Sequence, residues 1–206
     1  MVFTTACTHR PSTSALLEKG DFAYEYERYD EAARHYGMIV ENYPGDWEGQ
    51  YKLGLTLLEL DRPEEARRAL EVAMTSRPRD NDIADALAEA IYRTGDEADL
   101  FTFLNGQARE TQTVYAHTRI ARYAMYVGDP DTAKVAMETA IEIDGGRTAQ
   151  PYLDAAIFAE ELGDLDVAVR RLRQAYAIDP NNVEVRRRLI ALGEVPGPTL
   201  GLPPGR

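Results

Sequence analysis

The residues that could do chemistry are few and widely spaced. Cys7 is the only cysteine, so the sequence allows neither an internal disulfide nor a cysteine-based metal site. His9, His35 and His117 show no metal-ligand spacing, and none of them stands near a nucleophile in a Ser-His-Asp arrangement. Gly145-Gly146 lacks the Lys-Ser/Thr pair that completes a phosphate-binding loop. We therefore predict a protein that is not an enzyme and uses no metal and no cofactor.

Cys7 is also a candidate for lipidation. Thr5-Ala6-Cys7 resembles the end of a bacterial lipoprotein signal, where small residues precede the cysteine that is acylated. The charged and apolar regions of such a signal are missing, and Thr4 stands where these signals prefer Leu. Two alternatives stay open. The protein is cytoplasmic, or it belongs to the bacterial envelope and is lipid-anchored through Cys7 if the recorded start is truncated.

The charge balance limits the classes of partner. The 206 residues carry a net charge of −12, which repels the phosphate backbone of DNA or RNA. We therefore expect no nucleic-acid partner and a preference for basic or neutral ones. No stretch of about 18 apolar residues is present, so no transmembrane span is expected. The remaining expectation is a protein or peptide partner, whose identity the sequence does not reveal.

A motif that recurs about every 34 residues indicates the helices that would position any functional site. Pro44 and Pro78 are 34 residues apart, and Ala133 and Ala168 are 35 apart. Within each unit, apolar residues fall at i, i+3, i+4 and i+7, the spacing of one face of a helix. One helix pair cannot bury its apolar face alone, so neighbouring pairs must stack. The period predicts an array of helix pairs.

The period also predicts where each part of the chain begins and ends. We expect a flexible segment over residues 1–12, a solenoid over 13–193 and a Pro/Gly-rich disordered tail over 194–206. The expected repeat units are 13–46, 47–80, 81–113, 114–148 and 149–182, followed by a capping helix over 182–192. Arg186-Arg187-Arg188 of that helix should face outward. The unit 81–113 is degenerate, because Asn105-Gly106-Gln107 replaces its small packing residue.

The repeat pattern resembles that of the tetratricopeptide repeat family, and the sequence is identified as a bacterial member of it. The resemblance covers residues 13–192. It is carried by Leu53-Gly54, Ala66, Leu70, Ala73 and Pro78, by Gly20, Ala32, Tyr36 and Pro44, and by Ala156, Ala168, Leu172, Ala175 and Pro180. It implies an all-α, right-handed α-solenoid of about five helix-turn-helix units plus a C-terminal capping helix. It implies a scaffold or adaptor function without catalysis.

The resemblance also implies where a partner would bind. Its peptide or helix would lie in a concave groove lined by the first helix of each unit. The candidate groove residues are Tyr24, Tyr51, Leu55, Leu58, Tyr92, Arg93, Tyr115, Arg122, Tyr126, Leu153 and Ile157. The alternative is that individual tyrosines pack against the next repeat. A family subclass clamps a C-terminal carboxylate, but of the residues at its clamp places only Lys52 could serve. The second function considered is a lipid-anchored envelope scaffold for a secretion, pilus or cell-wall assembly.

Overall fold

The computed structural model describes residues 12–205, and within that range it contains eleven α-helices and no strand. The all-α fold predicted from the repeat is confirmed. The helices form two compact units, Met1–Asp96 and Glu97–Arg206. Cys7 lies outside the described residues, as does most of the predicted N-terminal segment. No helix in the described part of the chain is both long enough and apolar enough to cross a membrane.

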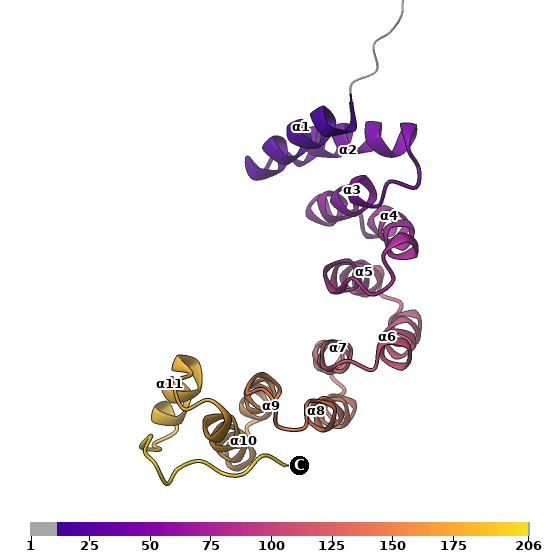
Figure 1. Cartoon of the computed structure of the whole chain (residues 1–206). Helices are drawn as coiled ribbons and strands as arrows, with labels where there is room; N and C mark the ends of the chain where they lie inside the picture. The colour runs from indigo at the N-terminus through magenta and orange to yellow at the C-terminus, as the bar shows by residue number, and fades with distance from the viewer. Residues whose placement is uncertain (1–11, 206) are drawn as a thin grey trace, which may run out of the picture. The chain divides into compact units, whose positions relative to one another are not determined.

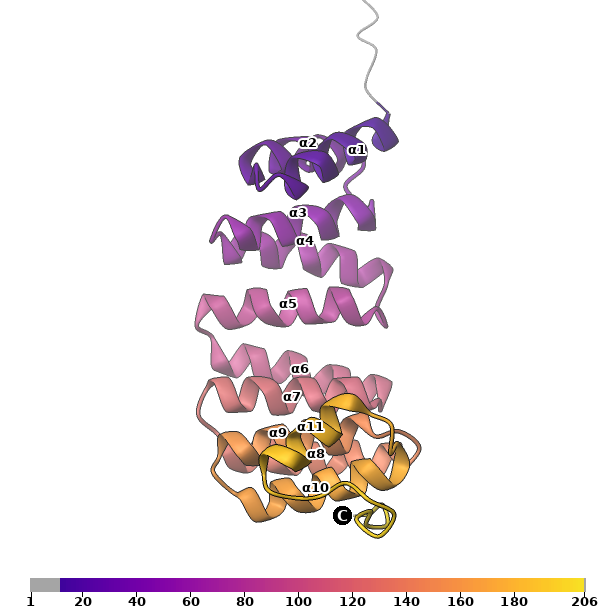
Figure 2. The ribbon, with the colours of Figure 1, turned by 90° about the vertical axis from the view of Figure 1, so that its left-hand side faces the viewer.

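The N-terminal unit contains two helix pairs and one further helix. In the region shown from indigo to magenta in Figure 1, the odd-numbered helices lie on one side and the even-numbered helices on the other. The elements are α1 Thr13–Glu25, α2 Tyr29–Asn42, α3 Trp47–Glu59, α4 Pro63–Ser76 and α5 Asn81–Thr94. Figure 2 shows these helices stacked with nearly parallel axes. Each pair therefore offers one face of odd-numbered helices, which is the surface on which the groove was predicted.

Local signals set the helix boundaries of this unit. Side-chain oxygens of Ser12, Asp46 and Asp80 accept hydrogen bonds from the free N–H groups of the first turns of α1, α3 and α5. Such N-caps satisfy donors that have no partner within the helix. Pro63 begins α4, where its missing N–H costs nothing. These local signals therefore set where the helices of this unit begin.

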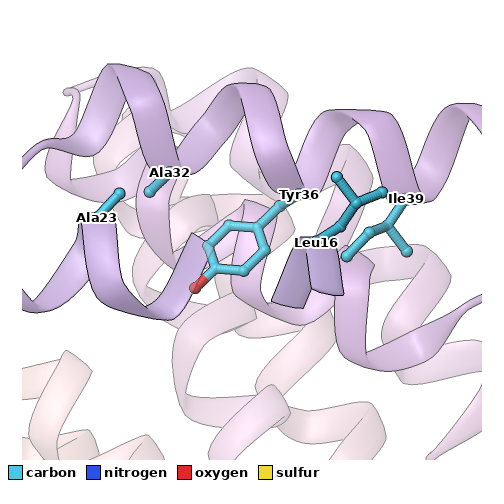
Figure 3. Close-up of a cluster of buried hydrophobic side chains, with 5 residues drawn as sticks. All are labelled: Leu16, Ala23, Ala32, Tyr36 and Ile39. Carbon is cyan, nitrogen blue, oxygen red and sulfur yellow. The ribbon is translucent and has the colours of Figure 1, made fainter. Parts of the chain in front are cut away.

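The core between α1 and α2 shows why the repeat needs a glycine in its first helix. The Tyr36 ring lies between the two helices, with Ala23 and Ala32 toward one end and Leu16 and Ile39 toward the other (Figure 3). A Cβ atom added at Gly20 would overlap this ring. In the next pair, a Cβ atom at Gly54 would lie 2.5 Å from Cγ of Leu70. Glycine therefore lets a large side chain of the second helix reach the first helix.

The C-terminal unit begins inside a predicted repeat. Its elements are α6 Glu97–Thr111, α7 Val114–Tyr126, α8 Pro130–Asp144, α9 Gln150–Glu161, α10 Leu165–Ile178 and α11 Val183–Ala191. The boundary between the units falls between α5 and α6, the two helices of the predicted unit 81–113. The buried stripe of α6, Leu100, Leu104 and Ala108, belongs to the core of the C-terminal unit. This repeat is the one that lacks the regular packing residue, so the sequence and the structure depart from the pattern at the same place.

The terminal helix α11 buries Val185 and Leu189, as a capping helix should. Arg186 and Arg187 are exposed, as predicted. The prediction was wrong for Arg188. This side chain is half-buried and donates to Glu160 at 2.6 Å and to Glu184 at 2.7 Å. Because Arg188 follows Val185 by three residues, it lies on the inner side of the helix, where the carboxylate of Glu160 on α9 compensates its charge.

The segment after α11 differs from the predicted disordered tail. Residues 194–205 form no helix, but they lie against α10 in the same unit (the yellow trace in Figure 1). Leu200 is buried, and its carbonyl oxygen accepts a hydrogen bond from Nε of Arg173 at 2.8 Å. The backbone N–H of Leu202 donates to the carbonyl of Arg173 at 3.0 Å. Composition predicted the irregular backbone correctly, but it could not show that side chains of α10 would hold this backbone.

Candidate peptide-binding surface

The odd-helix face of the N-terminal unit carries a compact polar site. Asp21 of α1 is its centre, because Oδ1 accepts hydrogen bonds from the Tyr36 hydroxyl at 2.6 Å and from Nζ of Lys52 at 2.8 Å. Burial, followed by the hydrogen bond to Asp21, raises the pKa of Tyr36 above its ordinary value. Lys52 is thus held by a carboxylate of its own chain and is not available for the carboxylate clamp. Lys52 was absent from the predicted set of groove residues.

Two tyrosines flank this site. Tyr24 and Leu55 line a shallow pocket of about 240 Å³ together with Asp21, Glu25, Tyr36 and Lys52. The ring of Tyr24 contacts the ring of Tyr29 edge to face, with centroids 5.3 Å apart. Tyr24 and Tyr51 are both half-buried, so each offers part of its ring to solvent while the rest is held in place. Rigid, partly exposed tyrosines of this kind are typical of binding hot spots.

The surroundings of these tyrosines are acidic. Burial raises the pKa of Tyr51, and the nearby carboxylates of Asp82, Asp80 and Asp85 raise it further. Burial and the carboxylate of Glu59 do the same for Tyr24. Two cations of this unit are already engaged by carboxylates, since Lys52 pairs with Asp21 and Arg93 pairs with Glu89 at 2.6 Å. The face therefore offers negative potential around aromatic rings.

The remaining predicted residues of this unit have different positions. Leu58 is only 6% exposed, so it is a core residue and was wrongly placed in the groove. Its carbonyl oxygen accepts a hydrogen bond from Nη1 of Arg93 at 2.9 Å. Tyr92 is half-buried and Arg93 is exposed. Leu58 was misplaced because a leucine at a helical spacing can point to either neighbouring helix, and only packing decides which.

The C-terminal unit brings together a separate set of predicted residues. Tyr115, Arg122 and Tyr126 are exposed and spaced by seven and four residues on α7, so they form one stripe along this helix. The ring of Tyr126 meets the buried ring of Tyr123 edge to face at 5.6 Å. On α9, Ile157 is half-buried, whereas Leu153 is only 5% exposed and lies in the core, contrary to prediction. The stripe of α7 is the accessible part of the set in this unit.

The surroundings of Asp154 on α9 shift the pKa of its carboxyl group. Burial raises the pKa of its carboxyl group, against the opposing effects of a hydrogen bond from Gln150 at 2.7 Å and of the positive charge of Arg122. A half-buried carboxyl group of this kind can accept a hydrogen bond from a donor on a ligand. Asp154 was not in the predicted set, and its spacing in the sequence gives no sign of this environment.

A cleft of about 990 Å³ opens between α6, α7 and α8 in the C-terminal unit. Its wall includes Phe101, Asn105, Arg109, His117 and Ile143. The place of His117 in its repeat predicts a core residue, but the side chain is half-buried on this wall. Asn105 belongs to the Asn-Gly-Gln segment that replaces the small packing residue of the degenerate repeat. The loss of regular packing at that segment is thus accompanied by an open cleft.

His117 should make stability depend on pH. Burial lowers the pKa of its imidazole below that of an exposed histidine, so the unfolded chain binds the proton more readily. As pH falls from about 7.5 to 5.5, this group should therefore destabilise the fold. We expect the melting temperature, measured by circular dichroism, to fall less over this pH range in His117→Gln than in the wild type. Equal losses in the two proteins would contradict a buried neutral histidine.

Comparison with known proteins agrees with these structural observations. Two family models described as tetratricopeptide repeat match residues 23–90 and 118–183. The unmatched stretch between them contains α6 and its Asn-Gly-Gln segment. A search of curated proteins found no match.

Several solved structures share the fold. A thermophilic tetratricopeptide repeat protein of Thermus thermophilus, TTC0263, is 21% identical, with 88% of this chain and 98% of that chain covered and a TM-score of 0.56. PilW, described as a widely conserved type IV pilus biogenesis factor, is 19% identical, with 86% and 83% covered and a TM-score of 0.62. YrrB, described as having an unusual peptide-binding site, is 14% identical, with 87% and 98% covered and a TM-score of 0.51.

At these identities the solved structures support the fold alone. The family models rest on the sequence itself and together span more than half of the chain. The recurring alanines, the glycines opposite Tyr36 and Leu70, and the stacked helix pairs agree with them. On this evidence, the chain belongs to the tetratricopeptide repeat family.

Proposed function

We propose that the protein is a non-catalytic scaffold that binds an extended segment of a partner on the odd-helix face of its N-terminal unit. The observation that carries the proposal is the pair of half-buried tyrosines, Tyr24 and Tyr51, within an acidic surface. Aromatic rings supply contact area with little loss of side-chain entropy, and the carboxylates favour cations. The partner segment should therefore carry Arg or Lys among apolar residues. Membership of a family of interaction scaffolds supports the same conclusion.

A selection from a random library of phage-displayed peptides tests this proposal. We expect the full chain to enrich peptides that contain Arg or Lys next to apolar residues. Binding of such a peptide should weaken about tenfold in the variant Tyr24→Ala with Tyr51→Ala, because each truncation removes a contact of hot-spot type. It should also weaken as salt is raised from about 50 to about 500 mM. Fluorescence anisotropy measures both effects.

Tyr43→Ala is the matched control for the tyrosine variants. Tyr43 directly follows α2, is 58% exposed and does not line the pocket around Asp21, so its removal should leave the affinity unchanged. Circular dichroism must show that the double variant keeps its helix content. Enrichment of acidic peptides, or an affinity that the double variant leaves intact, would refute the proposal. Loss of helix would instead show that the tyrosines are core residues, and the assignment of this face would fail.

The second candidate function is a lipid-anchored scaffold of a bacterial envelope assembly, in place of a cytoplasmic adaptor. The Thr5-Ala6-Cys7 junction favours it, and the similarity to a pilus biogenesis factor is compatible with it. Intact-mass analysis of the native protein in membrane and soluble fractions separates the two. An acylated chain that starts at Cys7 supports the envelope role. An unmodified chain in the soluble fraction supports the cytoplasmic adaptor.

A further inference from the structure

The irregular segment at the end of the chain is bound to the C-terminal unit as a peptide would be. We name residues 199–205 the strap. It runs antiparallel to α10, with Gly201 against Ala177 near the end of the helix and the Gly205 carbonyl at Arg171 toward its beginning. Beyond α10, a Cβ atom at Gly146, in the turn after α8, would lie 2.7 Å from Pro204. The strap therefore spans from α10 to the end of α8.

Buried polar side chains hold the backbone of the strap. Arg171 is 4% exposed and donates from Nη1 to the Gly205 carbonyl at 3.0 Å. Gln174 is 5% exposed and donates from Nε2 to the carbonyls of Pro203 at 3.3 Å and Gly205 at 3.1 Å. These contacts recognise main-chain oxygens, so they specify an extended backbone more than a side-chain sequence. Proline suits such a segment because it has no N–H group to satisfy.

The polar pair is specific to this repeat. Three residues after the first packing alanine of the second helix, two other repeats carry Ala69 and Ala136, both buried. The same place in this repeat holds Arg171. Burial lowers the pKa of its guanidinium group, which reflects the cost of removing a cation from water. The strap carbonyls offset part of that cost. This site therefore holds a cation that binds the strap, whereas Ala69 and Ala136 pack between helices and the first repeat carries His35 at this place.

The strap fills only part of the available surface. A cavity of about 150 Å³ lies between α8, α9 and α10, with Met137, Phe158, Leu162 and Val167 on its wall. Arg171 also lines it, so the cavity begins where the described strap reaches Arg171. A segment bound like the strap and continued in the same direction would pass Arg171 toward this cavity. A longer ligand can thus bury apolar surface that residues 199–205 do not reach.

We propose that the surface of α10 formed by Arg171, Arg173 and Gln174, with the adjoining cavity, is a second binding site, which takes an extended proline-rich segment of a partner protein. The strap occupies the site in cis, and the partner segment displaces it. The preferred ligand repeats the order Leu-Gly-Leu-Pro-Pro-Gly and continues with a large apolar residue, which enters the cavity. This site lies on α10, separate from the tyrosine face of the N-terminal unit, so its test does not depend on the proposed function.

Anisotropy of a labelled peptide tests this proposal on the full chain. The peptide is Thr-Leu-Gly-Leu-Pro-Pro-Gly-Phe, and a scrambled peptide of the same composition serves as its control. Leu200→Asp with Leu202→Asp releases the strap, because Leu200 is buried against the unit. We expect the released chain to bind the peptide at least about tenfold more tightly than the wild type, in which the strap competes intramolecularly. The scrambled peptide keeps the composition but not the placement of the apolar residues, so it should bind the released chain more weakly than the ordered peptide.

Substitutions in the released chain then locate the site. Arg171→Ala should weaken binding about tenfold, because it removes a charge-assisted hydrogen bond to a carbonyl. Gln174→Leu keeps the side-chain volume and should also weaken peptide binding. It therefore tests the site even if Arg171→Ala fails to fold. Arg186→Ala, an exposed arginine on α11, is the control and should change nothing. Absent peptide binding, or binding indifferent to both site variants, would overturn the proposal. A wild-type dimer without peptide binding would assign the site to the strap of a second copy and would also overturn it.

Discussion

The substitution Ala66→Asp should unfold the N-terminal unit. Ala66 is fully buried on α4, at the repeated alanine position where α4 packs on α3. An unpaired carboxylate there either stays charged at a high desolvation cost or forces the helices apart. The expected loss is about 4 kcal/mol or more, a large fraction of the stability of an ordinary domain. Because stacked repeats stabilise their neighbours, the loss should spread through α1 to α5.

Hydrogen exchange followed by mass spectrometry resolves this effect by unit. We expect amide protection to be lost over residues 13–94 and kept over residues 114–191. The control is Arg68→Asp, which places the same carboxylate at an exposed position of the same helix and should change the melting temperature little. A melting curve left unchanged by Ala66→Asp would contradict the repeat register. Equal loss of protection in both units would show that they unfold as one.

Tyr36→Ala should be the most damaging truncation in the first helix pair. The ring is 2% exposed and fills the space that Gly20 leaves between α1 and α2. Large-to-small changes of buried aromatic residues cost about 3–5 kcal/mol. The hydroxyl adds a second effect, because its loss removes one of the two hydrogen bonds that Asp21 accepts at this oxygen. Urea unfolding followed by circular dichroism measures the change in the free energy of unfolding.

Tyr36→Phe separates the two contributions. It keeps the ring and removes only the hydrogen bond to Asp21, so the expected cost is about 1 kcal/mol. Tyr115→Ala removes a tyrosine that is 66% exposed and should cost little. If Tyr36→Phe were as destabilising as Tyr36→Ala, the hydrogen bond and not the ring would dominate this core. If all three variants unfolded at the same urea concentration as the wild type, the core between α1 and α2 would not be as described.

Much of the fold could be predicted because successive repeat units carry the same local signals. Asp46 and Asp80 as N-caps, Pro63 at a helix start and alanine at each helix crossing act over a few residues, so they can be read without the tertiary structure. The period then supplied the order of the helices. The chain divides into its two units between α5 and α6, within the same repeat that carries the irregular Asn105-Gly106-Gln107 segment.

The candidate site was harder to predict, because burial on a helix depends on which neighbour a residue faces. Leu58 and Leu153 have the spacing of groove residues but are core residues, whereas Leu55 and Ile157 are partly accessible. The role of Asp21 depends on Tyr36 and Lys52, which follow it by 15 and 31 residues and reach it only after two helix pairs have formed. The residues next to Asp21 in the sequence do not indicate that it contacts Tyr36 and Lys52.

The sequence by itself determined the all-α repeat fold and the acidic charge balance, since these follow from periodicity and composition. Only the tertiary structure decided which tyrosines remain accessible, that Lys52 is held by Asp21, and that the proline-rich end lies on Arg171 and Gln174. The physical reason is that these contacts join residues far apart in the chain, and their energies depend on burial. Burial is a property of the packed helices and not of any single segment.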